Sequence, residues 1–293
     1  MALPSSASAT SHPTMETLLA GVSKISGQRQ VLIRLNWMLE DETRGARDLV
    51  ELLRMDQGLS ARVIAISNTA LYRGGDAVST VEEAVVRIGV WEIRRVLMSS
   101  IMREMTLGAL RVYNLAPGAL WGRSLLVAVG MAALTEETGA AADQCYTTGL
   151  LHGAGLIVID RWLCEKHPLR LPRVGSYDDP CRAARERELI GWTSEEVGAA
   201  LLESWRFPGP MLEAIRLALD PLAAGEHVRL AARLHLAQWC ARAIEARAAN
   251  KPLAALPEAG ILEAAGREPD AIEALLVDVQ QRFTDQKAAS GVG

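Results

Sequence analysis

Several features that would assign a chemistry at once are scarce in this chain or missing from it. No apolar run reaches the length of about 18 residues that a bilayer-spanning helix needs. Cys145, Cys164, Cys181 and Cys240 form no Cys-x-x-Cys pair, so we expect reduced structural thiols and a cytoplasmic protein. A glycine-rich phosphate loop and a Gly-x-Ser-x-Gly nucleophile motif are also missing. These absences argue against membrane insertion and against two common catalytic chemistries.

A dominant basic charge is missing as well. The chain has 31 Lys and Arg residues against 35 Asp and Glu residues, which gives a formal net charge of −4. Leu59 to Gly89 faintly resembles a helix-turn-helix, but acidic residues dilute the charge of the arginines that follow it. We therefore do not expect nucleic acid as a partner, and the hypothesis of a DNA-binding regulator has little support in the sequence.

What the sequence has in abundance is helical periodicity. Hydrophobic residues make up 49% of the 293 residues, and apolar side chains recur three or four positions apart along most of the chain. Thr80 with Glu83, and Thr193 with Glu196, have the spacing of capping boxes at helix starts. Because no convincing strand-like alternation interrupts the pattern, we predict an all-α fold.

Turn residues divide the chain into two helical lobes. The run Asn114-Leu115-Ala116-Pro117-Gly118 is the clearest boundary near the middle. We predict an N-terminal tail at 1–14, a first lobe at 15–112, a linker at 113–118, a second lobe at 119–283 and a C-terminal tail at 284–293. The segment from His167 to Pro180 is polar enough for a surface loop.

An ordered set of motifs resembles the HDOD family, bacterial signalling domains related to the HD phosphohydrolases. The resemblance runs from about Met15 to about Arg242. In the first lobe it rests on Asp56, Leu59-Ser60-Ala61-Arg62-Val63, Ser67-Asn68-Thr69-Ala70, Tyr72, Ser79-Thr80-Val81, Ala84-Val85 and Ile88-Gly89. In the second it rests on Leu120-Trp121, Ser124-Leu125, Gly149-Leu150-Leu151-His152, Gly191, Val197-Gly198-Ala199, Leu202, Trp205, Pro208 and Ala214-Ile215. The resemblance implies a two-lobed HDOD/HD-like helical architecture.

The metal ligands of an active HD enzyme are almost all missing. The resemblance implies a histidine near Arg123, a His-Asp pair at His152-Gly153, further histidines near Ser194 and Ala218-Leu219, and an aspartate near Gln238. Of this set the chain keeps only His152. A catalytic metal needs several converging histidine or carboxylate ligands. We therefore expect a degraded HD site, no metal, no cofactor and no catalysis.

The remaining residues of the degraded pocket leave two other hypotheses open. These pocket residues are Arg123, His152, Gly153, Ser194 and Gln238. His152 suits a hydrogen-bonded core histidine, Gly153 and Gly155 suit a close helix contact, and Arg123 suits an ion pair. Alternatively, Arg123 and His152 could contact the phosphate of a nucleotide or cyclic dinucleotide, which would make the protein a small-molecule receptor. A divergent metal-dependent phosphohydrolase ranks below this alternative.

The family resemblance implies an interaction or output module that works beside a receiver, kinase or cyclic-dinucleotide enzyme. The cleft between the lobes and a surface of the first lobe are the candidate partner sites. That surface comprises Asp56, Asn68, Tyr72, Arg87, Arg94 and Arg95. Asn68 can also serve to hydrogen-bond exposed backbone at a helix end. The charged cluster around Arg182 and Glu186 has the pattern of a solvated helix face with internal ion pairs.

Overall fold

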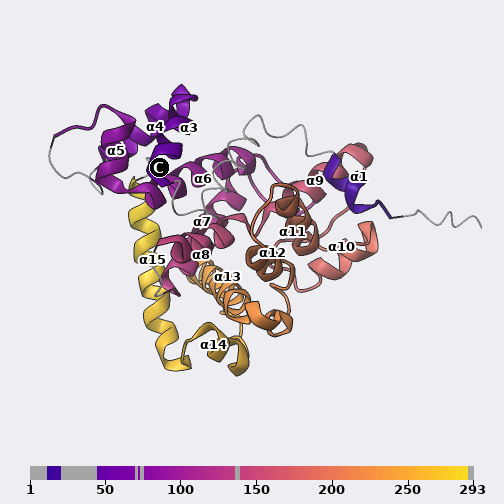
Figure 1. The fold of residues 1–293 in the computed structure, drawn as a ribbon. Coiled ribbons are helices and arrows are strands. Elements are labelled where there is room, and N and C mark those ends of the chain that lie inside the picture. Colours follow the sequence, from indigo (N-terminus) through magenta and orange to yellow (C-terminus); the bar gives the residue numbers. More distant parts are fainter. Residues whose placement is uncertain (1–11, 21–44, 70–71, 73–75, 136–138, 290–293) are drawn as a thin grey trace, which may run out of the picture.

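The structure, a computed structural model, describes residues 12–20, 45–69, 72, 76–135 and 139–289. Regular structure in these ranges is helical, apart from one isolated bridge between Leu110 and Leu115 (Figure 1). The predicted all-α class is confirmed. Residues 1–11 and 290–293, which belong to the predicted tails, lie outside the described residues, as do residues 21–44 of the first lobe.

The described part of the first lobe comprises α3 (Gly45–Arg54), α4 (Gln57–Ser67), α5 (Val81–Ile88) and α6 (Val90–Thr106). Apolar side chains one turn apart face inward, so Leu49, Leu53 and Val63 are fully buried. Thr80 and Glu83 form the predicted capping box at the start of α5. It satisfies two backbone N–H groups that would otherwise have no partner within the helix.

The second lobe is larger. It comprises α7 (Ala119–Ala133), α8 (Gly139–Leu151), α9 (Ala154–Lys166), α10 (Arg182–Ile190), α11 (Ser194–Ser204), α12 (Gly209–Arg216), the 3-10 helices η1 (Pro221–Ala223) and η2 (Gly225–His227), α13 (Val228–Ala248), α14 (Ala259–Ala265), the 3-10 helix η3 (Pro269–Ala271) and α15 (Ile272–Ala289). Thr193 and Glu196 form the second predicted capping box.

Glycines let two helix pairs of this lobe approach closely. A Cβ atom added at Gly149 would lie 2.8 Å from the Cα of Ala128, so α8 packs tightly on α7. A Cβ added at Gly155 would lie 1.9 Å from the backbone oxygen of Ser194. The predicted close helix contact at Gly155 is therefore confirmed, and it joins α9 to α11.

The first helix does not belong to the lobe predicted from its position. α1 (Met15–Ala20) packs on α9 and α11, on the far side of the second lobe from α3–α5 (Figure 1). Leu18 is fully buried there, and the indole of Trp192 donates a hydrogen bond to the oxygen of Pro13 at 3.0 Å. The predicted grouping of residues 15–112 is corrected for α1, since sequence proximity does not determine which core an isolated apolar turn reaches.

The last helix is longer than predicted. α15 continues to Ala289, six residues into the stretch from 284 that was predicted to be a tail. The amide of Gln286 donates to the hydroxyl of Tyr146 on α8 at 2.7 Å. The apolar pattern ends at Phe283, but good helix formers and this hydrogen bond extend the helix.

One apolar core connects the lobes. The cluster of buried side chains runs from Leu18 and the α3–α6 residues through α7–α13 to Val279 on α15. α6 packs against α4 and α5 on one side and against α7 and α8 on the other. The candidate site lies in the second lobe, between α7, α8, α10, α11 and α13.

Candidate functional site

His152 lies at the end of α8 and is buried and fully hydrogen-bonded. Its Nδ1 lies 2.6 Å from the backbone oxygen of Gly149, and its Nε2 lies 2.9 Å from the hydroxyl of Tyr177. Because a carbonyl oxygen can only accept, Nδ1 carries the proton and Nε2 accepts from Tyr177. Burial lowers the pKa of His152 to about 4, so the ring is neutral near pH 7. This is the core histidine that the sequence predicts.

Tyr177 occupies the centre of the site, and the sequence did not single it out. It comes from the non-helical segment 167–181 that follows α9. The guanidinium carbon of Arg123 lies 4.6 Å from the centroid of its ring, and that of Arg182 lies 5.6 Å from the same point. The segment predicted as a surface loop therefore lies partly inside the protein. It covers the site with Tyr177, and its Val174 is completely buried.

Arg123, on α7, holds one carboxylate on each edge of its guanidinium. Nη1 and Nη2 donate to the two oxygens of Asp178 at 2.7 and 2.9 Å. Nε and Nη2 donate to the two oxygens of Glu245 on α13. Burial alone would lower the pKa of Arg123, but these bonds outweigh burial and raise it. The predicted ion pair is confirmed, with two partners instead of one.

Arg182 holds a second buried network. Its Nη1 donates to Glu186 at 2.9 Å and also to the hydroxyl of Ser194, and its Nη2 donates to Glu195. Glu186 also accepts from the hydroxyl of Tyr113 at 2.9 Å and from the backbone N–H of Ser194 at 2.8 Å. Burial raises the pKa of Glu186, and the charge of Arg182 opposes that shift. The solvated helix face predicted here is wrong for Arg182 and Glu186, which are buried.

The five predicted pocket residues are only partly brought together. Tyr177 links Arg123 and His152, and Arg182 links Ser194 to the same tyrosine. Gly153 precedes α9, and a Cβ added there would lie 2.9 Å from Cδ1 of Leu120. Gln238 is buried on α13, and no hydrogen bond within the described residues joins it to Arg123 or His152.

Metal ligands do not converge in this region. No group of three or more His, Cys, Asp or Glu side chains within the described residues is placed to hold a metal ion. Asp178 and Glu186 instead accept hydrogen bonds from Arg123 and Arg182. A side chain longer than glycine at position 153 would also require Leu120 to move. The donor set present in this region therefore does not fit an HD metal centre.

The candidate surface of the first lobe has mostly structural contacts. Asp56 caps α4 by accepting from the N–H of Leu59 at 3.0 Å. Asn68 donates to the oxygen of Val78 and accepts from its N–H, both at 2.8 Å, which fixes the chain before α5. Arg87 donates to the backbone oxygen of Asp76. These residues hold turns in place, which is the structural role that the sequence predicts for Asn68.

Arg94 contradicts the surface assignment more directly. The side chain of Arg94 is 0% exposed and its Nη1 lies 3.1 Å from Oδ2 of Asp143, which is also 0% exposed. Arg95 lies 3.7 Å from the other oxygen of Asp143, and Tyr72 donates to Glu92 beside it. Burial lowers the pKa of Arg94 to about 10 and raises that of Asp143. These residues join α6 to α8, so the prediction that Arg94 lies on a surface is wrong.

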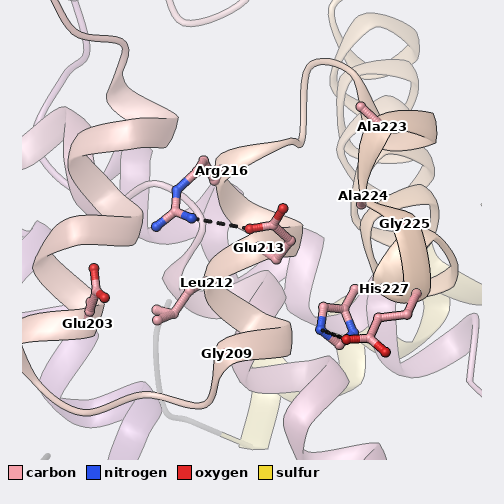
Figure 2. A pocket seen from close by; sticks show the side chains of 10 residues that line it. Glu203, Gly209, Leu212, Glu213, Arg216, Ala223, Ala224, Gly225 and His227 are labelled. Carbon is pink, nitrogen blue, oxygen red and sulfur yellow. Dashed lines mark hydrogen bonds and ion pairs between the residues drawn. The ribbon is translucent and has the colours of Figure 1, made fainter.

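A separate open pocket of about 500 Å³ lies between α12 and the two 3-10 helices η1 and η2 (Figure 2). Its charged lining consists of two pairs, Glu213 with Arg216 at 3.2 Å and Glu226 with His227 at 3.6 Å, together with Glu203. None of these residues contacts the Arg123–His152 cluster through a hydrogen bond in the described part of the chain. No described helix has the length and apolar character that crossing a bilayer requires.

Comparison with known families identifies the class of this protein. The HDOD domain model matches residues 27–221, well over half of the chain. The protein belongs to the HDOD family.

A curated relative is an uncharacterised protein of Treponema pallidum (strain Nichols), 25% identical over 191 residues. The match covers 63% of this chain and 36% of that protein, so the chain spans about a third of its relative.

Crystal structures of bacterial proteins share the fold. An HDOD domain protein of unknown function from Geobacter sulfurreducens has a TM-score of 0.64 and 19% identity, covering 95% of this chain and 99% of its own. A candidate signal transduction protein from Marinobacter aquaeolei VT8 has a TM-score of 0.71 and 18% identity, covering 94% and 65%. A candidate phosphohydrolase from Shewanella amazonensis SB2B has a TM-score of 0.62 and 22% identity, covering 94% and 95%. At these identities the likeness shows the fold alone.

Proposed function

We propose that this HDOD protein is a non-catalytic signal-transduction protein that acts by binding a protein partner. The observation that carries the proposal is the filling of the HD site. Arg123, Tyr177 and Arg182 occupy the space beside His152, and carboxylates of the same chain neutralise both arginines. A hydrolase needs an open position for metal-bound water and substrate. A pocket closed by its own ion pairs suits a scaffold better than an enzyme.

Turnover assays test the absence of catalysis. We expect no hydrolysis of a phosphomonoester or a phosphodiester with added Mg²⁺, Mn²⁺, Fe²⁺ or Zn²⁺ above the rate of a His152→Ala variant prepared in parallel. Comparing the two proteins separates intrinsic activity from contaminating phosphatases. Metal-dependent turnover by the natural protein that His152→Ala abolishes would overturn the proposal and support a divergent phosphohydrolase.

The partner surface of the first lobe must be redefined, because Arg94 is buried. Two exposed apolar side chains take its place, Met55 after α3 and Val86 on α5, at 72% and 88% exposure. α3 and α5 pack on each other, and Arg54 forms an ion pair with Glu82 between them. We infer that the two side chains belong to one interaction surface, because the helices that carry or precede them pack on each other.

Site-specific photo-crosslinking in the native cells tests this surface. We expect a crosslinker at Val86 to capture a receiver, kinase or cyclic-dinucleotide enzyme. Val277 on α15 provides a matched control, since it is also a surface valine on a helix and is 63% exposed. The same adducts from both positions, or none from Val86, would contradict a partner surface on α3 and α5.

A further inference from the structure

Asp178 occupies one edge of the Arg123 guanidinium with the geometry of a bidentate ligand. Its two oxygens accept from Nη1 and Nη2 at 2.7 and 2.9 Å, while Glu245 accepts on the Nε edge. One guanidinium therefore holds two carboxylates, one more than neutrality requires. Phosphoryl oxygens match a guanidinium edge in the same way as carboxylate oxygens do.

The two carboxylates differ in how firmly the fold holds them. Glu245 belongs to α13, a helix of 21 residues that packs on α7, α12 and α14. Asp178 belongs to a short non-helical stretch between two anchors. Upstream, the buried Val174 donates its N–H to Val112, and downstream Asp179 pairs with Arg185. Gly175 lies directly after the first anchor with φ +108°, a conformation that glycine adopts readily. Of the two, Asp178 is the carboxylate that can leave without disturbing a helix.

A further cation lies one helical turn from Glu245. Arg242 is half-buried on α13, three residues before Glu245, and it makes no hydrogen bond or ion pair within the described part of the chain. Burial raises the pKa of Tyr177 to about 12, and the charges of Arg182, Arg123 and Arg242 oppose that shift. Because Arg242 lies one turn before Glu245 on α13, both side chains project from the same side of that helix, on which Glu245 binds Arg123. Its guanidinium is open to solvent, so an anion can reach it.

We propose that this site binds a small anion bearing a phosphoryl group, which displaces Asp178 from Arg123 and takes Arg242 as its second cation. Asp178 is then the internal occupant of the site in the unliganded protein. Tyr177 and Asp178 are consecutive in this stretch. Displacement of Asp178 therefore also breaks the hydrogen bond between Tyr177 and His152. The proposal goes beyond partner binding and does not depend on it, since it concerns Arg123 and Arg242 and not the α3–α5 surface.

Calorimetry with inorganic phosphate and, separately, with a nucleoside monophosphate tests the site. Asp178→Asn keeps the shape of the side chain and removes the competing charge. We expect it to bind at least one of these anions about tenfold more tightly than the natural protein, the effect of one charge-assisted hydrogen bond. Asp278→Asn, which removes an exposed carboxylate from Arg282 on α15, is expected to bind like the natural protein.

Arg242→Gln in the Asp178→Asn background is expected to abolish this gain. Arg247→Gln on the same helix, whose arginine pairs with Glu273 at the surface, is expected to preserve it. Tighter binding of both anions by Asp178→Asn identifies the phosphoryl group as the recognised chemistry. Tighter binding of the nucleoside monophosphate alone supports the site and adds a contact with the nucleoside.

Amide hydrogen exchange measured on the natural protein does not depend on any variant folding. At saturating anion we expect faster exchange of the amides of residues 175–179, including that of Asp179, which now donates to Ser176 at 3.0 Å. Unchanged exchange in this stretch, together with equal anion affinity of Asp178→Asn and Asp278→Asn, would overturn the proposal. It would leave the partner proposal untouched.

Discussion

Burial decides the chemistry of His152. The imidazole has no water to stabilise a charge, its Nδ1 proton is fixed on Gly149, and its pKa falls to about 4. An unfolded chain holds its histidine proton up to about pH 6.5. Between about pH 6.5 and 4 the unfolded state therefore binds more protons than the folded state, so stability falls as pH falls.

We predict that the free energy of unfolding decreases by about 2–3 kcal/mol between pH 7 and pH 4.5 on account of His152 alone. Denaturant unfolding of the natural protein and of His152→Gln at both pH values isolates this contribution. The variant is expected to be less stable at pH 7 by about 1–2 kcal/mol and to lose less stability on acidification. Parallel pH profiles for the natural protein and His152→Gln would disprove the assignment.

Gly155 fixes the distance between α9 and α11. A Cβ there would lie 1.9 Å from the oxygen of Ser194 and 2.6 Å from the nitrogen of Gly198, and backbone atoms cannot rotate away. We predict that Gly155→Ala destabilises the protein by about 3 kcal/mol or more, at the upper end of overpacking effects. Gly122→Ala on α7 is the control, since a Cβ there meets nothing within 4 Å. It should stabilise the helix by about 0.5–1 kcal/mol. Similar melting temperatures for the two variants would show that the helices can separate.

The sequence predicts residues whose environment follows from local pattern. Gly155 and His152 lie in an apolar run, so a buried histidine and a close helix contact follow from their neighbours. Arg94 and Arg182 occur among other charges, and the pattern around them is that of a surface. Their burial depends on partners distant in sequence or on the neighbouring helix, such as Asp143 for Arg94. The role of Tyr177 could not be predicted for the same reason, because the sequence of a polar loop does not indicate which part of the core the loop covers.

At the scale of helices, the contact between α6 and α8 depends on a buried ion pair. Arg94 and Asp143 are both fully inaccessible, and Arg95 approaches Asp143 from the side. Ser99 on α6 and Tyr146 on α8 are joined by a hydrogen bond of 3.0 Å next to this pair. Removing one partner of a buried ion pair leaves a charge that neither water nor protein stabilises.

We predict that Arg94→Met destabilises the protein by about 3–5 kcal/mol, the range for breaking a buried pair. The double variant Arg94→Met with Asp143→Leu should lose less stability than Arg94→Met alone, because it leaves no uncompensated charge. Arg47→Gln, which breaks the exposed pair with Glu51, should change stability by less than about 0.5 kcal/mol. A double variant at least as unstable as the single variant would show that packing, and not charge, dominates this contact.

Element boundaries show the limit of sequence patterns in another way. The two capping boxes fix the starts of α5 and α11 because all their atoms lie within one turn. The end of α15 and the position of α1 depend instead on tertiary contacts, with Tyr146 in one case and with α9 and α11 in the other. Propensity could predict that these helices exist, but not what they pack against.

At the scale of the whole molecule, the two lobes share one core instead of having two. Buried side chains form a continuous cluster from α3 to α15, and α6 contributes to both lobes. α1 also links the two lobes, because it precedes the first lobe in the sequence and packs on the second. Under these conditions neither lobe can lose its packing without exposing apolar surface of the other.

We therefore predict that the lobes unfold together, in one calorimetric transition whose measured enthalpy equals the van't Hoff enthalpy. Arg94→Met should lower the temperature of that single transition, because the α6–α8 contact lies inside the shared core. Two resolved transitions in the natural protein, with Arg94→Met shifting only one of them, would show that the lobes are energetically independent. Independent lobes would confine any change at Arg123 to the second lobe. A shared core would let the proposed displacement of Asp178 act through α8 and α6 on the proposed partner surface of α3 and α5.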